Sequence, residues 1–105
     1  GLIPIVCIGE SKDQNTFEII EEQIKDIEKD VILAYEPLWA IGTGKNASFD
    51  KVREVREFLK DRKILYGGSV NSQNAKDYLE ITDGLLIGGA SLDAIEFLKI
   101  IKTAY

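Results

Sequence analysis

The sequence contains no histidine and no methionine, and Cys7 is its only cysteine among 105 residues. Without histidine, the chain cannot supply a Ser–His or Cys–His nucleophile pair or a histidine ligand for a metal. A single cysteine excludes a disulfide framework and a cysteine metal cluster within the chain, and it is typical of a reducing, cytoplasmic setting. Because the chain starts with glycine and holds no methionine, we expect it to be a piece of a longer polypeptide.

Positive charge and long apolar runs are also scarce. The chain has 13 Lys and Arg against 18 Asp and Glu, a net charge of −5, so we expect no attraction to nucleic acid or to an anionic membrane surface. No apolar run approaches the length of a membrane-spanning helix. With 45% hydrophobic and 30% charged residues, the composition predicts one small globular domain.

Four short apolar runs alternate with amphipathic helical patterns along the chain. The runs lie at residues 5–8, 31–35, 64–66 and 85–87. They lack strict alternation, which is typical of parallel strands covered on both faces. Ser48 is a candidate N-cap of the second helix, and the last helix should begin near Ser91 and bury Ile95, Leu98 and Ile101. The order β-α-β-α-β-α-β-α predicts an α/β fold with one parallel sheet.

Each apolar run ends in polar or glycine-rich residues, and ligands of parallel α/β proteins bind at that edge of the sheet. Two of these ends are alike, YGGSV at residues 66–70 and IGGAS at residues 87–91. Because glycine lacks Cβ, its backbone N–H group can approach an anion, and the helix that follows favours negative charge at its start. The glycines could instead serve only tight turns, but two successive copies favour a phosphate-binding cradle.

The stretch AYEPLWAIGTGK, residues 34–45, places a carboxylate where an apolar strand ends and follows it with proline. Pro37 restricts the backbone before it, and apolar neighbours would strengthen Glu36 as a general base once water is excluded. The plainer interpretation of Glu36 is a solvated surface charge. The residues that follow indicate a lid, because Trp39 and Ile41 offer apolar surface while two glycines give backbone freedom. The alternative is an ordinary loop whose tryptophan packs into the core.

Three other features have plain interpretations. Asn46-Ala47-Ser48 matches a glycosylation sequon, but nothing in the sequence suggests secretion, so we give it no role. We expect Cys7 to be a small core residue. Glu10 could be functional, but we expect it to complement the start of the following helix.

The segments CIGE, AYEPLWAIGTGK, YGGSV and DGLLIGGASL, in this order, closely resemble the second half of the triosephosphate isomerase family, from about Ile3 to the end of the chain. The resemblance implies that residues 1–105 form a single unit, the C-terminal half of a TIM (β/α)8 barrel with strands 5–8 and their helices. It implies an isomerase that interconverts dihydroxyacetone phosphate and glyceraldehyde 3-phosphate without cofactor or metal. It further implies a homodimeric full-length enzyme of glycolysis and gluconeogenesis in the cytoplasm, with a small phosphorylated triose as substrate and no nucleic-acid or membrane partner.

The resemblance also assigns roles to individual residues. Glu36 corresponds to the catalytic base that moves a proton between two carbons of the triose. The backbone N–H groups that hold the substrate phosphate correspond to those of Gly42, Ser69, Gly88 and Gly89. The closing loop corresponds to Pro37–Lys45, which includes Trp39. Ile41 and Leu86 correspond to apolar residues that clamp over the base, and Tyr66 and Ser69 to residues that bond the closed loop. Cys7 corresponds to a residue packed near the base, and Glu10 to one that contacts the loop tryptophan in its open position.

The chain departs from the family in several respects. The stretches between CIGE and Glu36 and between the loop and YGGSV are shorter than usual, and the helix after CIGE lacks the usual arginine-and-glycine segment. A complete barrel takes about 250 residues, and the family's substrate-binding lysine and histidine electrophile come from its first half. We therefore expect the chain alone to be inactive, with an exposed apolar inner face and two unpaired sheet edges. It should pair with the missing N-terminal half-barrel or self-associate.

Two alternatives remain open on the sequence. Another phosphate-binding barrel could use the same glycine loops, although such a cradle alone does not require the glutamate and lid of AYEPLWAIGTGK. A non-catalytic, self-associating half-barrel could retain only phosphate affinity. A closed homodimer of this chain would hold two copies of Glu36 and no electrophile.

Overall fold

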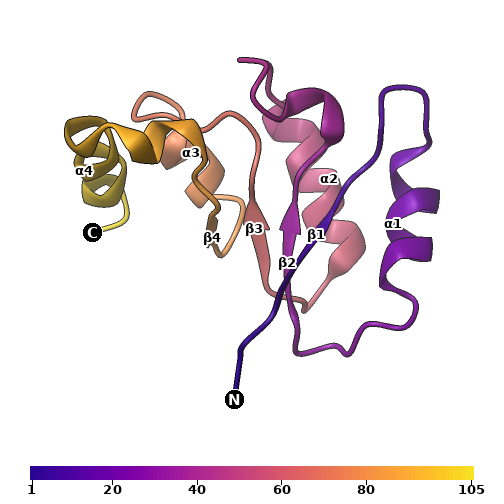
Figure 1. Ribbon diagram of the computed structural model, residues 1–105. Coiled ribbons are helices and arrows are strands. Elements are labelled where there is room, and N and C mark those ends of the chain that lie inside the picture. Colours follow the sequence, from indigo (N-terminus) through magenta and orange to yellow (C-terminus); the bar gives the residue numbers. More distant parts are fainter.

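The computed structural model describes all of residues 1–105, and its four strands form one parallel sheet in the order β1-β2-β3-β4 (Figure 1). The strands are β1 (Ile5–Ile8), β2 (Ile32–Tyr35), β3 (Ile64–Tyr66) and β4 (Gly84–Leu85). The helices are α1 (Thr16–Ile24), α2 (Phe49–Leu59), α3 (Ala75–Leu79) and α4 (Ala94–Thr103), and two short 3-10 helices are η1 (Leu38–Ala40) and η2 (Gly89–Leu92). The α/β fold with parallel strands is confirmed, and none of its helices is long and apolar enough to cross a membrane.

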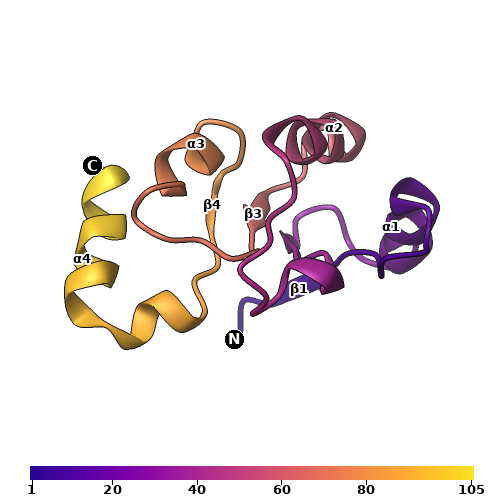
Figure 2. The ribbon, with the colours of Figure 1, turned by 90° about the horizontal axis from the view of Figure 1, so that it is seen from above.

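The sheet has two unlike faces, because all four helices lie along one side of it as an arc (Figure 2). The strands contribute these buried core residues on the helix side: Ile8, Leu33, Tyr35, Ile64 and Tyr66. On the opposite side the register pairs Ile5 with Ile32 and Cys7 with Ala34, and Ile5 is 47% exposed. Consecutive crossovers of one hand between neighbouring strands place every helix on the same side. The strands are therefore covered on one face only, and the expectation of two covered faces is wrong for this chain.

Side-chain caps define where three of the helices begin. Asn15, Ser48 and Asp93 each accept hydrogen bonds from backbone N–H groups in the first turn of α1, α2 and α4 respectively. These N–H groups have no partner within their own helix, so a side-chain oxygen at the N-cap stabilises the helix start. The prediction of Ser48 as an N-cap is confirmed.

The last helix begins later than expected and buries a different side. Ser91 belongs to η2, and Asp93 caps α4. Helix α4 carries apolar residues on more than one side, and only the side with Ile100 is buried. The three residues that the sequence pattern placed in the core are exposed: Ile95 (69%), Leu98 (55%) and Ile101.

Candidate active site

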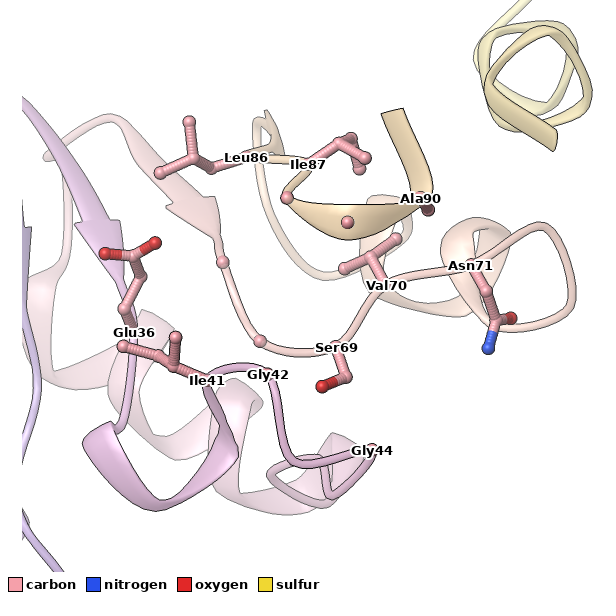
Figure 3. A pocket seen from close by; sticks show the side chains of 14 residues that line it. Glu36, Ile41, Gly42, Gly44, Ser69, Val70, Asn71, Leu86, Ile87 and Ala90 are labelled. Atoms are coloured by element: carbon pink, nitrogen blue, oxygen red, sulfur yellow. The ribbon is translucent and has the colours of Figure 1, made fainter. Parts of the chain in front are cut away.

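A cleft of about 600 Å³ lies where β2, β3 and β4 end on their carboxyl side (Figure 3). It is formed by the end of β2, the flap that follows it (residues 38–45), and the loops after β3 and β4. Seven of the predicted site residues line this one cleft: Glu36, Ile41, Gly42, Ser69, Leu86, Gly88 and Gly89. Pro37, Trp39 and Tyr66 are not among its lining residues. Segments far apart in the sequence therefore meet at one edge of the sheet.

Two glycines make room for Glu36 at the end of β2. A Cβ on Gly9 would lie 2.3 Å from the Glu36 carbonyl oxygen, and a Cβ on Gly67 would lie 2.4 Å from Glu36 Cγ and 2.8 Å from Oε1. The backbone N–H of Glu36 donates across to β1 at 2.7 Å. Its side chain points into the cleft, with Ile41 and Leu86 on either side (Figure 3). Glu36 is thus confined from two neighbouring strands while its carboxylate reaches the cleft.

Cys7 lies one strand away from Glu36 on the open face of the sheet. The register pairs Cys7 with Ala34, two residues before Glu36. A hydrogen bond to Glu36, burial and the charge of Glu36 together raise the pKa of Cys7 to about 11. The expectation that Cys7 is a core residue is wrong, because its register turns the exposed thiol to the face that the helices leave uncovered.

Glu10 is 3% exposed and does not line the cleft. Its carboxylate accepts hydrogen bonds from Tyr35 Oη at 2.8 Å and from Thr16 Oγ1 at 2.9 Å. Burial and the hydrogen bond to Glu10 raise the pKa of Tyr35 well above its ordinary value. Thr16 begins α1, so Glu10 does contact the helix start, although Asn15 caps the backbone there. The Glu10 carbonyl also accepts from the Leu38 N–H at 2.9 Å, which ties the end of β1 to the flap.

The flap combines a packed end with a glycine-rich tip. Trp39 lies in η1 and packs against the hydrophobic core, as in the plainer interpretation of this residue. Gly42 and Gly44 have φ angles of +63° and +74°, a conformation that a side chain would strain. Between these two parts, Ile41 is 46% exposed and lines the cleft. The flap therefore presents one apolar side chain to the cleft beside Glu36.

Two residues at and after the end of β3 bond the flap and the segment directly after it. Ser69 Oγ donates to the Ala40 carbonyl at 2.9 Å, and Tyr66 Oη accepts from the Ala47 N–H at 3.0 Å. Burial raises the pKa of Tyr66, and the hydrogen bond from Ala47 offsets part of this rise. Both side chains that the resemblance assigns to loop bonding thus contact the flap or the residues directly after it.

The two glycine pairs differ in what surrounds them. A Cβ on Gly68 would lie 2.0 Å from Tyr66 Oη, whereas a Cβ on Gly88 or Gly89 would meet nothing within 4 Å. The second pair leads directly into η2, a four-residue 3-10 helix, so the expected contribution of an α-helix start is small there. The space beside Gly88 and Gly89 is open to an anion, while the first pair makes room for protein groups.

Comparison with known proteins decides the family. The sequence model of the triosephosphate isomerase family matches residues 1–104. The chain is 38% identical to the triosephosphate isomerase of Legionella pneumophila (strain Paris), over 97% of the chain and 51% of that relative. It is 43% identical to those of Mesomycoplasma hyorhinis (96% and 48% covered) and Shewanella loihica (99% and 50% covered). The chain belongs to the triosephosphate isomerase family.

The chain spans about half the length of the triosephosphate isomerases that it matches. The alignments with the Legionella and Shewanella enzymes cover 127 and 130 positions, more than the 105 residues of the chain. These relatives therefore carry more residues than this chain within the matched region.

Several residues that line the cleft or bond the flap are not predicted by the sequence patterns. Seven further residues line the cleft: Gly44, Gly67, Gly68, Val70, Asn71, Ile87 and Ala90. Their signal in the sequence is that they lie in or near the glycine-rich segments 42–44, 67–68 and 88–89. Asn46, for which the sequence indicates no role, bonds both Tyr66 and Ser69. Its signal is its place directly after the flap, where an amide can donate and accept at once.

Proposed function

We propose that residues 1–105 are the C-terminal half of a triosephosphate isomerase barrel, strands 5–8 with their helices, and that they supply its base, closing flap and phosphate site. The observation that carries the proposal is a single cleft that holds Glu36, Ile41 and the open pair Gly88 and Gly89 together. Membership of the family supports the reaction, the interconversion of dihydroxyacetone phosphate and glyceraldehyde 3-phosphate.

Glu36 acts as the base in this proposal. Its carboxylate removes a proton from the carbon that carries the free hydroxyl group of dihydroxyacetone phosphate, and the electron pair of that C–H bond forms a carbon–carbon double bond. The π pair of the carbonyl moves onto its oxygen, which takes a proton from the electrophile of the missing half, so an enediol results. The double-bond pair then takes the proton back from the carboxyl group at the former carbonyl carbon, while the hydroxyl group on the first carbon gives up its proton and becomes the aldehyde carbonyl. Atoms and electrons therefore balance without a cofactor. A glutamate base with a closing loop is the established mechanism of this family. Gly9 and Gly67 support it by confining Glu36, because both transfers need one geometry.

The substrate phosphate binds to the backbone N–H groups of Gly42, Ser69, Gly88 and Gly89 in this proposal. Ile41 and Leu86, on either side of Glu36, exclude water when the flap closes (Figure 3). Water exclusion strengthens the electrostatic interactions of the base and protects the phosphorylated intermediate.

A second segment must complete the site. The chain has no histidine, and the family's histidine electrophile and substrate-binding lysine come from the first half of the barrel. We infer that this N-terminal half covers the open face around Ile5 and pairs with the free edges of β1 and β4. The chain alone is then inactive. The completed enzyme is a cytoplasmic homodimer of glycolysis and gluconeogenesis, as the family implies.

The same open face favours a second candidate function. Exposed apolar side chains such as Ile5 favour association of any kind, including that of two copies of this chain. Such an assembly would keep the open glycine pair and therefore phosphate affinity. It would hold two copies of Glu36 but no electrophile, so it would not be an isomerase.

A coupled isomerase assay on the chain, alone and mixed with an N-terminal half-barrel of the family, separates the two candidates. Glu36→Gln removes the base, and Glu21→Gln, on the exposed side of α1, is the matched control. We expect activity only in the mixture, lost with Glu36→Gln and kept with Glu21→Gln. Silence in a mixture that light scattering shows to be associated would overturn the isomerase proposal in favour of the second candidate.

A further inference from the structure

Asn46, the residue directly after the flap, bonds both Tyr66 at the end of β3 and Ser69 in the loop that follows. Its Nδ2 donates to the Ser69 carbonyl at 2.8 Å, and its Oδ1 accepts from Tyr66 Oη at 3.0 Å. The same Tyr66 oxygen accepts from the Ala47 N–H at 3.0 Å. A continuous chain of hydrogen bonds therefore runs from the backbone after the flap, through Tyr66 and Asn46, to the backbone of Ser69.

The chemistry of the partners determines the orientation of the Asn46 amide. The Ser69 carbonyl can only accept, so the amide nitrogen must face it, and the amide oxygen then faces Tyr66. Tyr66 already accepts from Ala47, which leaves its own proton free for Asn46. All donors and acceptors of this hydrogen-bond network are paired in one arrangement only. Consecutive hydrogen bonds of this kind polarise and strengthen one another.

Gly68 supplies the space in which these groups meet. A Cβ at this position would lie 2.0 Å from Tyr66 Oη and 2.9 Å from Asn46 Oδ1. The second glycine of YGGSV is therefore needed for the contact between the tyrosine hydroxyl and the asparagine amide, whatever ligand binds in the cleft.

The Ser69 carbonyl has a second amide donor that does not touch the flap. Asn74 Nδ2 donates to it at 3.0 Å from the turn before α3. The peptide between Ser69 and Val70 is further held by the Val70 N–H, which donates to the Gly68 carbonyl at 2.9 Å. Asn74 thus bonds the Ser69 carbonyl to the start of α3, whereas Asn46 bonds the same carbonyl oxygen to the end of the flap.

We propose that Asn46 is a positioning residue that couples the flap to the phosphate-binding backbone of Ser69. This inference rests on the proposed function of the cleft. Ser69 Oγ bonds Ala40 near the start of the flap, and Asn46 connects the Ser69 carbonyl to its end. Phosphate binding at the Ser69 N–H and the position of the flap then belong to one network, so each stabilises the other.

Asn46→Asp and Asn74→Asp form a matched pair, since each replaces one amide donor to the same carbonyl with an isosteric acceptor. Both variants should weaken inhibition by inorganic phosphate and raise KM for the triose, by about tenfold for the loss of one hydrogen bond. Only Asn46→Asp should also uncouple the flap. Because Trp39 is the only tryptophan of the chain, labelling this chain with 5-fluorotryptophan and leaving the N-terminal half unlabelled gives one fluorine resonance from the flap.

In the wild-type complex, saturating glycerol 3-phosphate should shift the Trp39 resonance. The shift should persist with Asn74→Asp and be lost with Asn46→Asp at equal phosphate occupancy. Equal fluorine responses in the two variants would overturn the inference and leave Asn46 a structural residue. If Asn46→Asp fails to assemble, Asn46→Ala tests the same prediction without the added charge.

Failure of the proposed function would be visible separately. The wild-type complex would then show no isomerase activity, while phosphate binding and the Trp39 response need no turnover. An inactive complex that binds glycerol 3-phosphate and loses the fluorine response with Asn46→Asp would support the coupling and reject the isomerase. A wild-type complex in which phosphate leaves the Trp39 resonance unmoved would reject the coupling even if the complex is active.

Discussion

The glycine pairs 67–68 and 88–89 look alike in sequence, and their surroundings differ in the fold. The missing Cβ of Gly67 leaves room for Glu36, and that of Gly68 leaves room for Tyr66 and Asn46. Around Gly88 and Gly89, no atom lies within 4 Å of the corresponding position. The first pair is therefore required by the protein itself, whereas the second is free to meet a ligand.

The difference follows from the place of each pair in the sheet. The first pair follows β3, which has β2 on one side and β4 on the other. Side chains from the end of β2 and from the residues after the flap therefore fill the space around it. The second pair follows β4, the edge strand of the sheet, so one side of it has no neighbouring strand. Within this chain, the two glycine pairs thus have unlike surroundings because one follows a central strand and the other an edge strand.

Gly67→Ala should have the largest effect, because the new Cβ would lie 2.4 Å from Glu36 Cγ and would displace the base. A displacement of roughly 1 Å at a reacting group costs about a hundredfold in rate. We expect a loss of at least about a hundredfold in kcat of the completed enzyme, measured in the coupled assay. Glu21→Gln, on the exposed side of α1, is the control. Near-normal kcat in Gly67→Ala would show that Glu36 adapts to the loss of space.

Gly68→Ala should act mainly on stability, since its Cβ would lie 2.0 Å from Tyr66 Oη and not at the base. Overpacking of this kind costs about 1–3 kcal/mol, which urea unfolding of the chain would measure. Tyr66→Phe removes the hydroxyl oxygen with which the new Cβ would clash. The loss of unfolding free energy in the double variant should therefore be smaller than the sum of the losses in Gly68→Ala and Tyr66→Phe. Strict additivity would contradict a clash with the tyrosine hydroxyl.

Gly89→Ala should leave stability within about 0.5 kcal/mol of the wild type, because nothing lies near its missing Cβ. The added methyl group would instead occupy the space that we assign to the substrate phosphate. Inhibition of the completed enzyme by inorganic phosphate should weaken by about tenfold, the effect of one impaired hydrogen bond. Destabilisation as large as that of Gly68→Ala would mean that the two pairs are equivalent after all.

The comparison also shows which features a sequence can predict. Alternating apolar runs and helical patterns were sufficient for the βα order, and parallel strands bring their carboxyl ends to one edge. Glu36, Ile41, Ser69 and the second glycine pair therefore came together in one cleft as expected.

Other features depend on neighbours that a local pattern does not encode. Whether a glycine faces protein or open space depends on strand order. Cys7 lies on the open face of the sheet because of its register with Ala34. Ile95 and Leu98 are exposed because burial depends on what packs against α4, and nothing in the apolar periodicity specifies this. Asn46 was missed because its role exists only when Tyr66 and Ser69 lie beside it.

The smallest expected effect concerns Cys7, whose thiol is hydrogen-bonded to Glu36, the residue for which Gly67 leaves room. Its pKa is raised from 9.0 to about 11, first by its hydrogen bond to Glu36. The folded chain therefore holds the thiol proton more tightly than the unfolded chain. The resulting contribution to stability is complete below pH 9 and is lost as the pH rises through 11.

The rate of iodoacetamide alkylation, followed by mass spectrometry against pH, reports this pKa because only the thiolate reacts. Its midpoint should lie near 11 in the wild type and move toward 9 in Glu36→Gln, which removes the charge, and in Gly67→Ala, which displaces it. Gly89→Ala should leave the midpoint unchanged, since no protein group depends on the space beside it. A midpoint that stays near 11 in Gly67→Ala would mean that Glu36 keeps its place against an added Cβ. The contrast between the two glycine pairs would then lie in their exposure to ligand alone.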